Sequence, residues 1–315
     1  MAMRTYRPIH VGTLASGAAL QLPLHEIRGD RPGPTVGLCA AIHGEEATGV
    51  EILYRFLTAV DLDGLAGRLL VMPVANPFSF AAVTRHTPID MNNLNRVFPG
   101  QAGGFLTEQL AHRMVADFLA GLDVFIDFHA GGATPTVDYV YIINAEDLSR
   151  AFGSRLLYRP KETLAGTSVS VTRERGVRSV VVELGGGRVD QAGFVARGLA
   201  GLLNILRAVG SLPGTPTPPP AQIVLREIAT LRPRHGGLLL PEVTTLGAEV
   251  RGGQVLGRIV SPYSLEELEV VRCPVARGVV VLTHLVPSVV EPGIYGFMIG
   301  DLASAEGPGQ GGANS

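Results

Sequence analysis

The stretch Ala41–Glu46, which reads AIHGEE, joins an apolar run to a helical pattern. The run 35–42 has the continuous apolar character of a buried strand, whereas apolar residues recur at helical spacing in 47–60. Sheets of the α/β class usually carry their chemistry at such a junction of strand and helix. His43 and Glu46 lie three positions apart there, so both side chains can reach one ion, and zinc readily accepts an imidazole and a carboxylate. The alternative is a surface histidine beside a carboxylate that caps the helix.

The composition indicates a folded protein with a sizeable core. Of 315 residues, 46% are apolar and 17% are charged, which suits one large domain or two ordinary ones. The formal net charge of −2 gives no electrostatic reason to expect binding to nucleic acid or to an anionic membrane. We therefore expect neither of these partners.

The cysteines and the N-terminal sequence indicate the compartment. Cys39 and Cys273 are far apart and lie in apolar surroundings, as expected of two buried thiols in a reducing compartment. Residues 1–6 contain no apolar signal core, and no stretch reaches the length of about 18 apolar residues that a membrane-spanning helix needs. We expect a cytoplasmic protein.

The order of the predicted elements indicates the fold class. After an opening hairpin in 9–28, strands alternate with helices as far as residue 209. The pattern predicts strands at 35–42, 69–74, 123–129, 137–143 and 179–184, and helices at 47–60, 105–122, 145–157 and 192–209. Such alternation predicts an α/β fold with a mostly parallel mixed sheet and helices on both of its faces.

A proline-rich segment divides the chain. Five prolines between residues 211 and 220 exclude a helix and predict a stiff linker. Beyond it, short β-rich runs between glycine and proline turns predict a smaller all-β domain. We therefore predict a domain with the candidate site at 1–210, a linker at 211–221, an all-β domain at 222–303 and a flexible tail at 304–315.

A polar segment at 76–100 is long for a loop inside a compact domain, and loops of this length are usually functional. It carries Arg85, Asn95 and Arg96. An exposed arginine is ordinarily only solvated. Beside a metal site, however, one guanidinium would stabilise an oxyanion and another would grip a carboxylate.

His129 is the best candidate for a third metal ligand. It ends the predicted strand 123–129, at what we expect to be the same edge of the sheet as His43 and Glu46. A lone histidine there is more often structural, but these three side chains together complete a set that leaves a fourth position open. Asp127 points to the same face as His129 and would orient its imidazole, unless it serves only as a turn or capping partner.

Glu183 is a carboxylate inside an apolar run, 180–184, where a charge is costly unless it is used or paired. Burial would raise its pKa, which suits a general base that later acts as an acid. The alternative is a buried ion pair with a neighbouring arginine such as Arg178.

Four segments occur in the order 43–46 (HGEE), 92–100 (NNLNRVFPG), 127–129 (DFH) and 183–187 (ELGGG). Together they resemble the succinylglutamate desuccinylase/aspartoacylase family, a branch of the zinc carboxypeptidase-like fold. The resemblance covers residues from about 35 to about 190, and the β-rich end is similar to the family's C-terminal domain with weaker motifs. One departure is Glu45, where the family more often has Asp or Asn.

The resemblance implies one zinc ion per chain, held by His43, Glu46 and His129. It implies that Glu183 acts as the general base and then as the acid. Another divalent metal in the same ligands is not excluded by the sequence.

The resemblance also implies how the substrate is held. Asn95 and Arg96 would hold its carboxylate, and Arg85 would polarise the scissile carbonyl. Arg173 is a further candidate for a second carboxylate contact.

The function that follows is a zinc-dependent amidohydrolase that removes an acyl group, such as acetyl or succinyl, from a small N-acyl amino acid. Residues 84–90 look closest to members that deacetylate N-acetylated diamino acids. The alternatives are a metallocarboxypeptidase that acts on a peptide C-terminus and a non-enzymatic binding protein whose β domain docks a partner. A homo-oligomer is compatible with the sequence.

Overall fold

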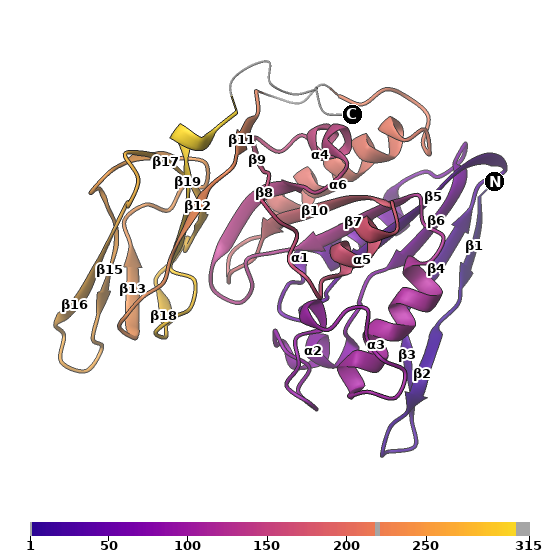
Figure 1. Ribbon diagram of the computed structural model, residues 1–315, viewed down its shortest axis with the longest axis horizontal. Helices are drawn as coiled ribbons and strands as arrows, with labels where there is room; N and C mark the ends of the chain where they lie inside the picture. The colour runs from indigo at the N-terminus through magenta and orange to yellow at the C-terminus, as the bar shows by residue number, and fades with distance from the viewer. Residues whose placement is uncertain (1, 218–220, 307–315) are drawn as a thin grey trace.

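The computed structural model describes residues 2–217 and 221–306. Within them, most strands belong to one long sheet, and helices cover both faces of its N-terminal part (Figure 1). The sheet runs in the order β1 (Met3–Tyr6), β4 (His25–Arg28), β6 (Ala66–Met72), β5 (Arg31–Ala40), β7 (Val124–His129), β10 (Arg178–Gly185), β8 (Thr136–Ile142), β17 (Arg277–Thr283), β19 (Phe297–Asp301) and β12 (Ile228–Leu231). Three further strands pair beside this path: β9 (Leu156–Tyr158), β11 (Ile223–Leu225) and β14 (Glu249–Arg251).

The centre of the sheet is parallel. β5 runs parallel to β6 and β7, and β7 runs parallel to β10. β4 is antiparallel to β1 and β6, and β8 is antiparallel to β10. The predicted α/β fold with a mixed sheet is therefore confirmed, and the carboxyl ends of its central strands meet at one edge.

Helices cover both faces, as predicted. One face carries α1 (Thr48–Ala59), α4 (Glu146–Ala151) and α6 (Ala192–Ala208). The other carries a hairpin, β2 (Ile9–Thr13) with β3 (Ala19–Leu22), and the helices α3 (Leu106–Met114) and α5 (Ser168–Glu174). Successive residues of a strand point to opposite faces, so Val180 and Val182 of β10 join the first core and Val181 joins the second.

The segment 76–100 is not one irregular loop, contrary to the sequence-based expectation. α2 (Pro77–Ala82) begins in it because the Asn76 side chain accepts a hydrogen bond from the backbone N–H three residues on, and because proline fits the first helical position. A single 3₁₀ turn, η1 (Leu94–Arg96), follows in the same segment.

Two helices are shorter than predicted. In 105–122, α3 ends at Met114 and gives way to a π-helical turn, η2 (Val115–Leu119). In 145–157, α4 ends early because Gly153 adopts a φ of +88°, and strand β9 takes up the last residues.

The C-terminal part is β-rich, as expected, and it extends the main sheet. β17 pairs with β8 through Leu282 opposite Val137. A second sheet runs in the order β16 (Glu267–Arg272), β15 (Val255–Val260), β13 (Gly237–Pro241) and β18 (Ser288–Val290), and a short turn, η3 (Leu302–Ser304), follows β19. Figure 1 shows these strands, in orange and yellow, as a lobe beside the N-terminal part.

The domain borders stay a prediction. Prolines 218–220 of the expected linker, and 307–315 of the expected tail, lie outside the described residues. Within the described ranges, none of the helices has both the length and the apolar character needed to cross a membrane.

Candidate active site

The ends of three neighbouring strands bring the candidate residues together. His43 and Glu46 lie in the turn between β5 and α1, and His129 is the last residue of β7. Glu183 on β10 stands directly opposite His129 in the parallel register. Because β5, β7 and β10 are parallel, their carboxyl ends deliver these side chains to one edge of the sheet.

Strand alternation also sets the face on which these side chains lie. Phe125 and Val181 belong to the core beneath the hairpin and α3. His129 lies four residues after Phe125, and Glu183 lies two residues after Val181, so both point to that same face. The register of β7 and β10 therefore fixes the positions of His129 and Glu183.

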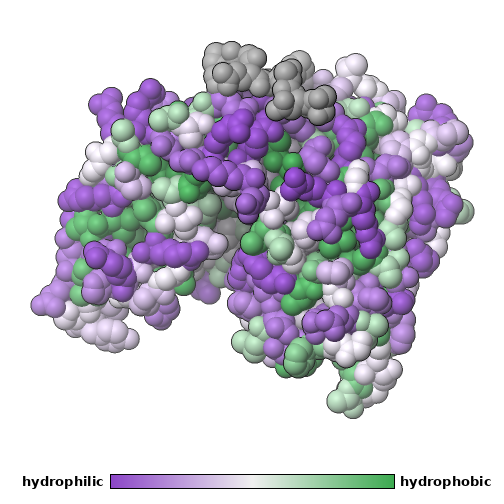
Figure 2. All heavy atoms as spheres, in the orientation of Figure 1, coloured by the Kyte–Doolittle hydropathy of each residue, from purple (hydrophilic) through white to green (hydrophobic). Residues whose placement is uncertain are grey.

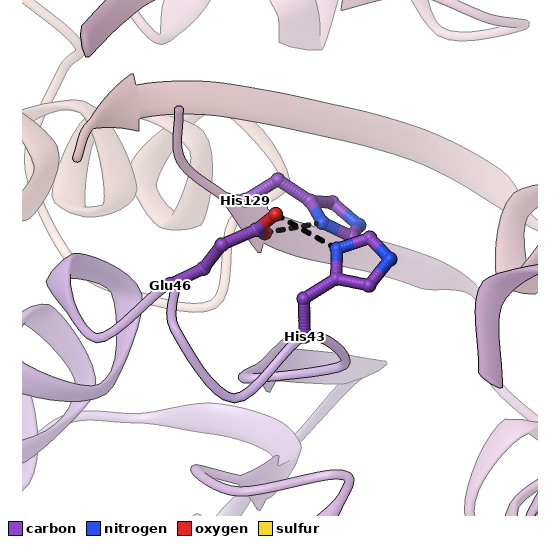
Figure 3. A group of neighbouring side chains, drawn as sticks. All are labelled: His43, Glu46 and His129. Carbon is purple, nitrogen blue, oxygen red and sulfur yellow. Dashed lines mark hydrogen bonds and ion pairs between the residues drawn. The ribbon is translucent and has the colours of Figure 1, made fainter. Parts of the chain in front are cut away.

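Glu46 lies between the two imidazoles (Figure 3). Its Oε1 is 2.8 Å from Nδ1 of His43, and its Oε2 is 2.8 Å from Nδ1 of His129. The backbone N–H of Ala130 also donates to Oε2, at 3.2 Å. All three side chains are buried, and one ligand atom from each lies within 4.8 Å of the others.

These residues fit a divalent metal ion by the chemistry of their donor set. Two imidazoles and one carboxylate are a zinc-type set with room for a further ligand. The far nitrogen of each ring is also held: Nε2 of His43 lies 3.1 Å from Asn93 Oδ1, and Nε2 of His129 lies 3.3 Å from Asp127 Oδ2. Partners on the far nitrogens direct both Nδ1 atoms toward the centre, as outer contacts do in metal sites.

A second ring of hydrogen bonds supports Asp127. Ser168, the first residue of α5, donates its hydroxyl to Asp127 Oδ2 at 2.5 Å and its backbone N–H to Asn95 Oδ1 at 3.0 Å. The amide nitrogen of Asn95 lies 3.5 Å from Nε2 of His129. The start of α5 therefore links the predicted substrate residue Asn95 to the imidazole of His129.

Charges inside the cluster are strongly interdependent. Burial alone would raise the pKa of Glu46, but the two neighbouring imidazoles hold it well below its usual range. Burial would lower the pKa of His129, but the carboxylates of Asp127 and Glu46 raise it well above its usual range. A cation is thus favoured between these groups. A metal ion would replace the imidazole proton, because only a neutral imidazole binds a metal.

Glu183 is buried, and its pKa is raised to about 8. Burial is the main cause, and the negative charges of Glu46 and Asp127 add to it, whereas His129 and Arg85 oppose it. The alternative role for Glu183, an ion pair with Arg178, is not found, since Arg178 pairs with Asp147 at the surface.

The arginines divide into two groups. Arg85 approaches the cluster, with Nη1 3.2 Å from Glu46 Oε1, and about a third of its side chain (34%) is exposed. Arg96 donates to the backbone oxygen of Asn95 and faces the same cavity. Arg173 is different: it is exposed, donates to the Thr163 hydroxyl at 2.9 Å and is not among the residues that line the cavity.

The cavity has a volume of about 660 Å³ and lies between the two lobes of the molecule. Seven predicted site residues line it: Arg85, Asn95, Arg96, Glu183, His43, Glu46 and His129. Tyr139 and Tyr141 line it from β8, and Arg232, Tyr295 and Met298 line it from the C-terminal part. Figure 2 shows an indentation between the same two lobes.

Gly44 holds the turn between β5 and α1 against α2. A Cβ at this position would lie 1.9 Å from the backbone carbonyl group of Ser79, so only glycine allows this approach. The N–H of Gly44 donates to the backbone oxygen of Thr84 at 2.9 Å. The turn with His43 and Glu46 is thereby tied to the segment that presents Arg85.

Sequence reasoning missed several residues of the site. No sequence motif indicates that Ser168 contacts Asp127 or that Asn93 contacts His43. Asn93 does lie within the segment 92–100 that carries the family resemblance. Tyr139 and Tyr141 were detectable, because alternation in the predicted strand 137–143 places both on one face. Residues of the C-terminal lobe had no such signal.

Known proteins match this chain over most of its length. Residues 32–209 match the family described as "Succinylglutamate desuccinylase/Aspartoacylase catalytic domain". The chain is 30% identical over 261 residues to the N-alpha-acetyl-L-2,4-diaminobutyric acid deacetylase of Halomonas elongata, a match that covers 76% of this chain and 74% of that protein.

Solved structures are similar over nearly the whole chain. A succinylglutamate desuccinylase from a Silicibacter species aligns with a TM-score of 0.83 and 27% identity, covering 95% of this chain and 94% of that one. The product-bound ectoine utilization protein EutE (DoeB) from Ruegeria pomeroyi aligns with a TM-score of 0.84 and 26% identity, covering 95% of each chain. The sequence match, the shared fold and the site geometry lead to one conclusion: this chain belongs to the succinylglutamate desuccinylase/aspartoacylase family.

Proposed function

We propose that this chain is a zinc-dependent hydrolase that cleaves the amide bond of an N-acyl amino acid. The observation that carries the proposal is the placement of Glu183 directly opposite His129, in the same cavity as the His43–Glu46–His129 cluster. A buried carboxylate with a raised pKa beside a metal-type donor set is the arrangement that hydrolysis of an amide needs.

The metal would be held by Nδ1 of His43, Nδ1 of His129 and the Glu46 carboxylate. When bound, zinc supplies a Lewis acid that lowers the pKa of water and stabilises negative charge on oxygen. Asp127 and Asn93, on the far nitrogens, keep the two rings in this orientation.

Glu183 would move the proton in both halves of the reaction. Its carboxylate takes a proton from the attacking water, and its carboxylic acid then returns that proton to the nitrogen of the leaving amine. Burial raises the pKa of Glu183 to about 8, and a bound dication would lower it, so both the acid and the base form would be accessible near neutral pH.

The arginines would hold the substrate and its developing charge. Arg85 lies against the cluster and faces the cavity, so its guanidinium is placed to donate to the oxyanion. Asn95 and Arg96, side by side on η1, are placed to bind the carboxylate of the amino acid. Arg173, the further candidate for a carboxylate contact, is left out of this mechanism, because it is exposed and is not among the described residues that line the cavity.

For the substrate we propose an N-acetylated diamino acid. The relative from Halomonas elongata is named for deacetylation of N-alpha-acetyl-L-2,4-diaminobutyric acid, and it is similar to this chain over three quarters of its length. The resemblance of residues 84–90 to members with this type of substrate supports the same choice.

The test is release of free amine from a panel of N-acetyl, N-succinyl and N-formyl amino acids, with and without a chelator. We expect release from an N-acetyl diamino acid that a chelator abolishes and added zinc restores. If the zinc-loaded protein released no amine from the panel but removed C-terminal residues from peptides, a carboxypeptidase would replace the deacylase. Full activity in the chelator would contradict the metal dependence.

A further inference from the structure

The cavity contains more negative charge than the proposed reaction uses. Five carboxylates line it: Glu45, Glu46, Asp127, Glu162 and Glu183. Three have roles, since Glu46 would hold the metal, Asp127 contacts His129 and Glu183 would move the proton. Glu45 and Glu162 remain, and Glu162 is exposed whereas Glu45 is half-buried.

Glu45 lies between His43 and Glu46 in the turn before α1, and it lines the cavity. Its carboxylate accepts a hydrogen bond from the backbone N–H of Ala133 and lies against Gly132. A Cβ on Gly132 would stand 2.9 Å from Oε1 of Glu45, so the bare backbone there leaves room for the carboxylate. The side chain is therefore held in a defined place on the cavity wall.

No arginine or lysine of the described residues forms an ion pair with Glu45. Arg85 is near enough to attract it, but Arg85 makes its ion pair with Glu46. The carboxylate of Glu45 therefore lines the cavity without an ion-pair partner among the described residues, and it is half-buried. A buried or half-buried carboxylate of this kind is stabilised by a cation that enters the cavity.

The cationic side chains point to the same conclusion. Among the described residues, Arg85, Arg96 and Arg232 line the cavity. Arg85 and Arg96 are placed for the oxyanion and the α-carboxylate. Arg232 donates to the backbone oxygen of Gly293 at 2.6 Å and stacks over the ring of Tyr295 at 4.5 Å. The described cavity thus offers no unengaged guanidinium for a second carboxylate, as an acidic amino acid would require.

We infer that Glu45 binds the side-chain ammonium group of the substrate and so selects N-acyl diamino acids over neutral and acidic ones. The inference rests on the proposed deacylase function. An ammonium group beside the carboxylate would form a charge-assisted hydrogen bond inside the cavity, and a substrate with a neutral chain would leave the carboxylate unpaired.

The test is steady-state kinetics of the zinc-loaded protein with two matched substrates. N-acetyl-L-2,4-diaminobutyrate carries the ammonium group, and N-acetyl-L-norvaline replaces it with a methyl group of similar size. We expect E45Q to raise KM for the first substrate by about tenfold or more, with kcat little changed, and to leave KM for the second within about twofold. E162Q removes the other uncommitted carboxylate of the same cavity and should leave both substrates within about twofold.

A binding measurement separates recognition from catalysis. In the E183Q background, calorimetry with N-acetyl-L-2,4-diaminobutyrate should show the same loss of affinity when E45Q is added. An equal effect of E45Q on both substrates, no effect on either, or a selective effect of E162Q instead would overturn the role of Glu45. If the wild-type protein released amine from N-acetyl-L-norvaline but not from the diamino substrate, the inference would fail and the deacylase function would stand. Silence with every N-acyl amino acid would remove both.

Discussion

At the scale of single residues, the burial of Glu183 determines its chemistry. A carboxylate on a core strand would be destabilising if it served only structure, because burial disfavours its charged form. The strand nevertheless keeps it, opposite His129 and beside a cavity. Its pKa of about 8 results mainly from that burial. Strand geometry thus gives Glu183, the proposed base, both its position and its raised pKa.

The pH dependence of activity follows from this pKa. Glu183 must be deprotonated to accept a proton from water, so activity should rise with pH until the carboxylate is ionised. A bound dication would stabilise the carboxylate and lower its pKa, so we expect the midpoint of the acidic limb between about pH 5 and about pH 8. The measurement is kcat/KM of the zinc-loaded protein from about pH 5 to about pH 9. A flat profile over that range would argue against Glu183 as the base.

Ser168 should support the metal site through Asp127. S168A removes the hydroxyl that donates to Asp127 at 2.5 Å, so the carboxylate that holds Nε2 of His129 loses a partner. We expect zinc affinity to fall by about 10- to 100-fold, measured by competition with a coloured chelator. S170A is the control, since the Ser170 hydroxyl donates to the backbone oxygen of Thr167 and not to Asp127. Equal affinities for the two variants would show that Asp127 does not depend on Ser168.

At this scale the sequence predicts the residues of the cluster but not their supports. His43, Glu46, His129 and Glu183 can be placed together because each lies at or near the end of a recognisable strand. Ser168 reaches Asp127 across 41 positions of sequence, and no local pattern predicts such a contact. The location of Arg173 depends on the direction of α5, which the sequence does not specify.

At the scale of elements, the strands and helices around the turn 41–47 fix the geometry of the site. The turn 41–47 is fixed at one end by β5 and at the other by α1, and Gly44 presses its backbone against α2. The core strands were predictable because long apolar runs dominate their local signal. α2 and the early end of α4 were not, because a cap at Asn76 and a left-handed glycine at 153 decide them.

Gly44 offers a direct test of this arrangement. G44A places a methyl group 1.9 Å from the carbonyl group of Ser79, so the turn and α2 must separate. We expect the free energy of unfolding to fall by about 1–3 kcal/mol in urea denaturation, with activity lost in step. G103A is the matched control, because a Cβ there meets nothing within 4 Å. Equal stability of the two variants would mean that the contact with α2 is not needed.

At the scale of the whole molecule, the C-terminal strands complete the cavity. The sequence predicts their β character and the break in composition before them. It does not predict that β17 pairs with β8, because pairing between distant segments has no local signature. As a result Arg232 and Tyr295 reach the same cavity as Glu183, although they follow it by 49 and 112 positions in the sequence.

Metal binding should stabilise the whole fold, since the proposed ligands come from two separate segments, the turn after β5 and the end of β7. A ligand that binds only the native state adds about 2.7 kcal/mol to the free energy of unfolding when its free concentration is about a hundred times its dissociation constant. We therefore expect zinc to raise the unfolding temperature of the wild-type protein, recorded by calorimetry. H129A lacks one ligand and should show little of this shift. A comparable shift in H129A would place the zinc elsewhere.

The central claim, a metal-dependent deacylase in which Glu183 moves the proton, is tested most directly by one paired measurement on E183Q. Zinc content and amine release from N-acetyl-L-2,4-diaminobutyrate are recorded for the wild-type and E183Q proteins side by side. Glutamine keeps the shape of the side chain but cannot accept the proton. We predict about one zinc per chain in both proteins and a fall in turnover of about 10²–10⁴-fold in E183Q. Stoichiometric zinc with most of the activity retained in E183Q would contradict the account.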